Sequence, residues 1–201
     1  MIKQLVLSIA LAACCASGVQ AQMSGKTAAP AKAAMVDPAK SFGAMLTSFE
    51  GEFMGLAKAM PADKFNFAPS QAIFAGSQKT DYLSPNNKGV RTFAENLTHV
   101  AQVNYFFASR LSGLKPDVDV NAIGSLKDKD QIIAALEGSF AFAHKAIATL
   151  TPENAFESVG GDRTRASLAA SIVSHGFDHF GHLAEYLRMN GMIPPSSQPK
   201  K

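Results

Sequence analysis

The chain has 201 residues, a formal net charge of +3 and an apolar content of 47%. Its length is enough for one domain with a substantial core. The net charge is small, and no stripe of Lys and Arg alternates with aromatic residues, so nucleic acid is not an expected partner.

Residues 1–21 have the features of a secretion signal. Lys3 supplies a positive start, residues 5–13 form a short apolar run, and Val19-Gln20-Ala21 is a small-residue cleavage site. The apolar run is shorter than the roughly 20 residues that span a bilayer. We therefore expect an exported protein, periplasmic or secreted, whose mature form begins at Gln22 and has no transmembrane helix.

The segment Leu11-Ala12-Ala13-Cys14 resembles a lipoprotein cleavage box, which is the alternative interpretation. In that case the protein would be anchored to a membrane through a lipidated Cys14. Cleavage after Ala21 would instead remove both cysteines, Cys14 and Cys15. The mature chain would then have no disulfide, no thiolate nucleophile and no cysteine metal ligand.

The rest of the chain predicts a linker followed by four helices. Residues 22–37 are rich in Ala, Lys, Ser, Gly and Pro, which indicates a flexible linker. Apolar residues then recur at spacings of three and four, with recognisable caps at the ends. This pattern predicts an all-α four-helix bundle over 38–195, followed by a loose tail at 196–201. The helices are expected over 38–60, 92–112, 128–149 and 163–189.

Two helix starts carry specific capping signals. Asp37-Pro38 places an N-cap residue before a proline at the first helical position. Thr92 and Glu95 have the spacing of a capping box. The long connection at 61–91 contains apolar residues that we expect to pack over the bundle, namely Phe65, Phe67, Ile73, Phe74 and Tyr82. No alternation typical of strands competes with the helices.

Three of the five histidines lie in the segment Ser174–Gly191. His175, His179 and His182 are four and three residues apart, which places them on one face of a helix. That face continues an apolar seam and is expected to point into the bundle core. Because a buried polar group without a partner costs about 1–3 kcal/mol, these imidazoles need partners. A divalent metal would satisfy them together, and separate hydrogen bonds are the alternative.

The two other histidines in the chain belong to different predicted helices. His99 falls at the edge of the apolar face of the helix over 92–112, which makes it a candidate ligand from a second helix. His144 falls beside the apolar face of the helix over 128–149, and we expect it at the surface or rim.

Several separated motifs resemble the DinB-like family of metal-binding four-helix bundles. They are residues 60–69 (MPADKFNFAP), residues 91–95 (RTFAE) with the following His99, and residues 175–181 (HGFDHFG) with 186–191 (YLRMNG) and Pro194-Pro195. The resemblance covers about 40–195. It implies an up-down-down-up bundle in which His99, His175 and His179 bind one divalent metal. Water would fill the remaining coordination positions.

The chain departs from the family pattern after the second histidine of the last helix. Relatives often have Arg-Gly-Gln there, whereas this chain has Phe180-Gly181-His182. His182 is therefore a candidate catalytic general base beside the metal, or a fourth ligand. An anion contact made by the arginine of relatives would be missing at Phe180. Glu95, Asp178 and Tyr186 are further candidates for proton transfer, each with a structural alternative.

The sequence leaves three classes of function open. One is a metal-dependent transferase or hydrolase that acts on a small-molecule substrate. The second is a non-catalytic metal-binding or metal-stabilised module of the cell envelope, and the third is a helical adaptor without metal. Imidazole ligands suit Zn, Ni, Fe and Cu alike. A homodimer is compatible with the sequence, and export would limit access to cytosolic thiols as substrates.

Overall fold

The computed structural model describes residues 34–70 and 90–199 of the chain. The chain from Val36 onward forms one compact unit. The expected signal segment 1–21 and lipoprotein box lie outside the described residues, as does most of the expected linker. Ile73, Phe74 and Tyr82 of the predicted packing segment also lie outside them. Within the described part of the chain, no helix combines the length and the apolar character needed to cross a membrane.

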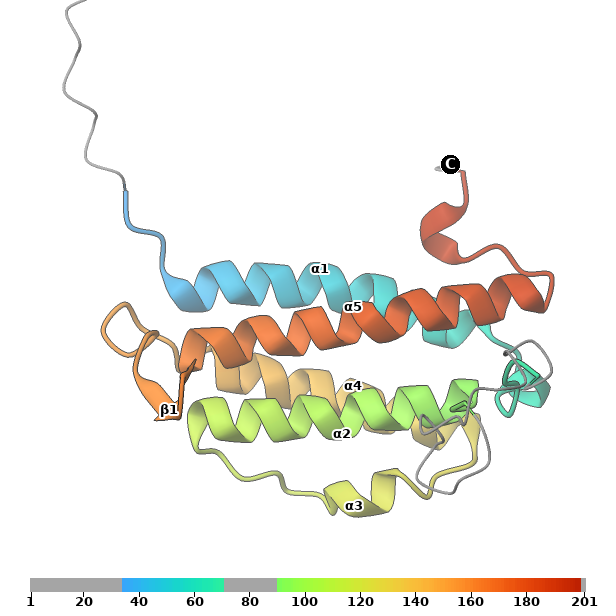
Figure 1. The fold of residues 1–201 in the computed structure, drawn as a ribbon, viewed down its shortest axis with the longest axis horizontal. Helices are drawn as coiled ribbons and strands as arrows, with labels where there is room; N and C mark the ends of the chain where they lie inside the picture. Colours follow the sequence, from blue (N-terminus) through green and yellow to red (C-terminus); the bar gives the residue numbers. More distant parts are fainter. Residues whose placement is uncertain (1–33, 71–89, 200–201) are drawn as a thin grey trace, which may run out of the picture. The chain divides into compact units, whose positions relative to one another are not determined.

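Four long helices form the bundle, which confirms the predicted all-α fold. They are α1 (Pro38–Ala59), α2 (Phe93–Ser112), α4 (Lys129–Ile147) and α5 (Arg165–Met189). Figure 1 shows α1 and α5 running in one direction and α2 and α4 in the other, which is the up-down-down-up order. Helices α2 and α5 pack against each other, and α1 packs against α4 and α5. The connection between α2 and α4 runs back along the bundle (Figure 1) and makes these two helices parallel.

The capping residues explain why the helices begin close to the predicted positions. Asp37 Oδ1 accepts a hydrogen bond from Lys40 N at 2.9 Å at the start of α1. Thr92 N donates to Glu95 Oε2 at 2.9 Å, and Glu95 N donates to Thr92 Oγ1 at 3.1 Å. This reciprocal pair is the predicted capping box, and it satisfies backbone donors that have no partner within the helix.

Short elements occur where the sequence analysis predicted none. They are the 3-10 turn η1 (Ala62–Lys64), the one-turn helix α3 (Val120–Ile123), and the antiparallel strands β1 (Ser158–Gly160) and β2 (Arg163–Thr164). Strands of two and three residues are too short to show an alternating pattern. Gly160 and Gly161 have φ values of 119° and 59° and make the turn between them. Helix α5 therefore begins at Arg165, later than the predicted residue 163.

The sequence analysis predicted a loose tail from residue 196, but the first residues of this segment are ordered. Residues Pro195–Ser197 form the 3-10 turn η3, which packs against α1. Arg188 Nη2 donates to Ser197 Oγ at 3.3 Å. The fixed φ of Pro194 and Pro195 favours this turn after the helix has ended.

The segment after α1 packs over the bundle in the part that the structure describes. Phe65 is buried, and its ring centroid lies 5.3 Å from that of Phe93. Phe67 contacts Tyr186 edge-on, with the ring centroids 5.6 Å apart. The predicted packing of Phe65 and Phe67 is confirmed.

A glycine lets α5 approach α1 closely beside the histidine-bearing turn. Gly176 is buried in α5, and a Cβ atom built there would overlap the ring of Phe49. Phe49 is fully buried and packs against Phe53 and Phe140. The absence of a side chain at residue 176 therefore allows α5 to pack closely against the ring of Phe49.

We expect Gly176→Ala to lower the free energy of unfolding by about 1–3 kcal/mol, the usual cost of overpacking a core. Gly181→Ala is the matched control in the same helix, because nothing lies within 4 Å of the Cβ position there. The control should be neutral or more stable, since alanine favours a helix over glycine by about 1 kcal/mol. Urea unfolding measures both variants, and equal stabilities would contradict the close approach at Phe49.

Candidate metal centre

The three candidate ligands meet where α2 packs against α5. His175 and His179 lie one turn apart on α5, and His99 faces them from α2. The Nε2 atoms of His175 and His99 are 3.2 Å apart. The three ring centroids lie between 4.6 and 5.1 Å from one another. Each ring offers one nitrogen atom as a ligand, and these three nitrogen atoms lie within 4.8 Å of one another. The three residues could therefore hold a metal ion.

The chemistry of the nitrogen atoms fits a cation. A neutral imidazole has one N–H donor and one nitrogen lone pair. The two facing Nε2 atoms need a proton between them when no ion is bound. His175 Nδ1 is buried and has no hydrogen-bond partner among the described residues. A divalent ion would accept the lone pairs directly, and three neutral imidazoles are a donor set that zinc and similar metals prefer.

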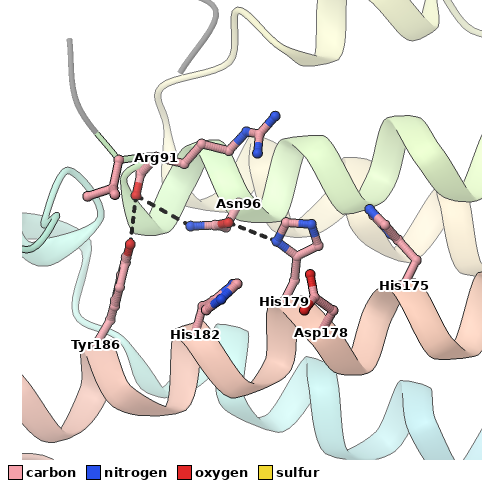
Figure 2. Close-up of a pocket in the computed structure, with 8 residues that line it drawn as sticks. Arg91, Asn96, His175, Asp178, His179, His182 and Tyr186 are labelled. Carbon is pink, nitrogen blue, oxygen red and sulfur yellow. Dashed lines mark hydrogen bonds between the residues drawn. The ribbon is translucent and has the colours of Figure 1, made fainter. Parts of the chain in front are cut away.

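Asn96 determines which nitrogen of His179 is free to bind. The buried Asn96 side chain donates through Nδ2 to the carbonyl oxygens of Thr92 at 3.0 Å and Arg91 at 3.4 Å. Its Oδ1 is therefore the acceptor for His179 Nδ1 at 2.9 Å, as Figure 2 shows. Consequently His179 Nδ1 carries the hydrogen and Nε2 keeps its lone pair. The Tyr186 hydroxyl donates to the same Arg91 carbonyl at 3.0 Å and holds this backbone in place.

Burial keeps the three imidazoles uncharged at neutral pH. Desolvation, with smaller contributions from the charges of Arg91 and His175, lowers the pKa of His99 to about 4. Desolvation lowers the pKa of His179 to about 3, with smaller contributions from its charged neighbours. The pKa of His175 is also lowered by burial, although the Asp178 carboxylate acts in the opposite direction. Uncharged imidazoles are the form that binds metal.

A cavity of about 290 Å³ adjoins the histidine group on the side of α5. Its lining residues come from the start of α2 and from α5, and Figure 2 shows them as sticks: Val90, Arg91, Asn96, His175, Asp178, His179, His182 and Tyr186. A second cavity of about 300 Å³ contacts His99 and Glu95, and Arg91 lines both cavities. A small molecule could therefore lie beside the candidate metal ligands.

His182 does not lie in the core, contrary to the prediction for the helix seam. Its side chain is exposed, because this part of the seam borders the cavity instead of an apolar neighbour. Asp178, His179 and His182 form a second group whose ligand atoms lie within 4.8 Å of one another. Both groups share His179, so they are alternatives for one ion. The group with His99 has the more buried members and draws on two helices.

Two of the other candidates for proton transfer, Tyr186 and Glu95, have structural roles. The Tyr186 hydroxyl is occupied by the Arg91 carbonyl. Glu95 caps the start of α2. His144 lies outside the site, where its Nε2 is 2.8 Å from a carboxylate oxygen of Glu50. Asp178 is exposed in the wall of the cavity, so it remains a candidate beside His182.

Two residues of the site were not predicted from the sequence. Asn96 lies on the buried side of α2, and its polar side chain on an otherwise apolar helix face is the signal that could have identified it. Arg91 precedes the N-cap residue of α2, so it lies outside the helix and helical periodicity gave no signal for it. Its charge acts on all three histidines.

A comparison with protein families agrees with this fold and this histidine group. The model of the DinB superfamily matches residues 45–183, which is most of the bundle. The chain belongs to the DinB superfamily. This is a metal-binding family, in accord with a group of histidines that could hold a metal. A search of curated proteins found no match.

We expect the metal-free protein to lose stability as the pH falls below about 6.5. The pKa of His99 is about 4 in the folded protein and near 6.5 in the unfolded chain. The unfolded chain therefore binds more protons between these values, so the contribution to stability is complete above 6.5 and is lost toward pH 4. Urea unfolding with chelator, from pH 5 to 7, measures the slope. The variant His99→Gln should show a shallower slope, and identical slopes would contradict a buried neutral His99.

Proposed function

We propose that the protein binds one divalent metal ion through His99, His175 and His179 and uses it to act on a small molecule. The observation that supports this proposal is the direct contact between the histidine group and the adjoining cavity. His175 and His179 belong to both, so a molecule in the cavity would lie beside the ion. The metal is one that imidazole binds, such as Zn, Ni, Fe or Cu.

A metal-dependent transferase or hydrolase reaction suits this arrangement. A bound divalent ion would polarise a carbonyl or lower the pKa of a water molecule. His182 and Asp178 are exposed in the cavity wall, where they can exchange protons with solvent and with a bound molecule. His182 is grouped with Asp178 and His179, and not with His99 and His175. This supports a role for His182 as a proton carrier beside the site over a role as fourth ligand.

A non-catalytic, metal-stabilised module is the second candidate. The observation that favours it is the close approach of the Nε2 atoms of His99 and His175, which lie 3.2 Å apart across the interface of α2 and α5. An ion shared between α2 and α5 would tie the two helices together and would satisfy nitrogen atoms that otherwise destabilise their interface. In this case removal of the metal would lower stability, and no reaction would depend on His182.

The ligand set is tested by metal analysis of protein purified without a histidine tag. We expect His99→Ala, His175→Ala and His179→Ala each to lose stoichiometric metal, because each removes one of three lone-pair donors. We expect His182→Ala to retain the metal and to lose activity on a test substrate. Loss of the metal from His182→Ala would make it a ligand and favour the non-catalytic function. Full occupancy in all four variants would contradict the proposed site.

The orienting role of Asn96 is tested by the variant Asn96→Ala. Removing the acceptor for His179 Nδ1 frees the ring to change tautomer and should weaken metal binding about 10- to 100-fold, as for other groups that orient metal-binding histidines. Asn104→Ala is the matched control, since Asn104 is also a buried asparagine of α2 but bonds Ser139 Oγ at 3.1 Å, away from the histidines. Competition with a chelator measures the affinity, and equal affinities in the two variants would exclude the role.

A further inference from the structure

Arg91 differs from the other four arginines of the chain in having no partner for its side chain among the described residues. Arg165 and Arg188 pair with Glu157 and Glu185. The two remaining arginines, Arg110 and Arg163, lie over the rings of Phe106 and Phe107. The guanidinium of Arg91 has no ion pair and no hydrogen bond among the described residues.

The acidic residues that share a cavity wall with Arg91 form no ion pair with it. Glu95 lines the second cavity with Arg91, but its carboxylate accepts the backbone N–H of Thr92. Asp178 lines the first cavity and forms no ion pair with Arg91. An uncompensated guanidinium at the wall of a cavity is a ready binding group for an anion.

The charged side chain of Arg91 extends toward the candidate metal centre (Figure 2). Arg91 lines the first cavity together with His175 and His179, and the second cavity together with His99. Its charge lowers the pKa of all three rings. Figure 2 shows the Arg91 side chain running along α2 from the first turn toward the histidines. Because the three imidazoles are neutral ligands, a divalent ion held by them would keep its full charge. The cavity would then present two positive groups to its contents.

We propose that the cavity binds a small molecule with a single carboxylate, and that Arg91 recognises that carboxylate. This inference rests on the proposed function, because the bound metal supplies the second positive charge. The planar guanidinium matches a carboxylate through two parallel hydrogen bonds. The volume of about 290 Å³ suits a small molecule. The negative charge of Asp178 in the same wall disfavours a dianion such as phosphate.

Arg91 also changes an expectation drawn from the family pattern. The sequence places Phe180 where relatives have an arginine, which predicted the loss of an anion contact on α5. The structure offers a guanidinium to the site from the residue just before the N-cap of α2, the other ligand-bearing helix. The cation is therefore supplied from a different position in the chain.

The inference is tested by calorimetric titration of the zinc-loaded protein with benzoate, benzamide and inorganic phosphate at low salt. Benzamide has the shape of benzoate without its charge. We expect benzoate to bind more tightly than the other two, and Arg91→Gln to weaken benzoate binding at least tenfold. Arg91→Lys should recover part of the affinity, because it keeps the charge without the two parallel hydrogen bonds. Arg110→Gln, in α2 but outside this cavity, should bind as the wild type does.

Each contrary outcome has a distinct meaning. Equal affinity of the wild type and Arg91→Gln for benzoate would overturn the inference. Tighter binding of phosphate than of benzoate through Arg91 would overturn the assignment of a carboxylate. Metal content is measured on the same samples, and a wild-type protein without bound metal would contradict the proposed function alone. The comparison of Arg91→Gln with Arg110→Gln in metal-free protein would then decide the role of Arg91.

Discussion

The transfer of three imidazole rings from water into a helix interface is the constraint on which this site depends. A protonated imidazole would be poorly tolerated there, so burial keeps the rings uncharged and leaves each with a lone pair. Uncharged rings still need partners. Asn96 supplies one to His179, while the Nε2 atoms of His99 and His175 face each other at 3.2 Å. The interface thus offers nitrogen lone pairs that a cation could bind, which an apolar interface would not.

Most of the fold could be predicted because its signals are local. Periodicity and caps such as Asp37 and Thr92 lie within a few residues of the helix starts that they specify. The four-residue step from His175 to His179 is local in the same sense. The bond between Asn96 and His179 joins residues 83 positions apart, and no local pattern encodes that pairing. The short strands β1 and β2 were also not predicted, because strands of two and three residues are too short to show an alternating pattern.

The two errors at the site share a physical origin. Helical spacing correctly put His182 on the face of its two neighbouring histidines, but it could not show that this face opens into a cavity. The importance of Arg91 likewise comes from the lack of an ion pair to its guanidinium in the described part of the chain. The cavity beside His182 and the surroundings of Arg91 both form only when helices from distant parts of the chain assemble. Neither can therefore be predicted from a local sequence pattern.

The distribution of the candidate ligands along the chain has a consequence for biosynthesis. His99 and His175 are 76 positions apart, and α5 is the last long helix to be made. A nascent chain therefore presents only one of the three imidazoles until translation is nearly complete. Closing so long a loop around an ion before the core has formed would carry an entropic penalty. If the protein binds an ion through these residues, this penalty would favour metal acquisition after the bundle has assembled.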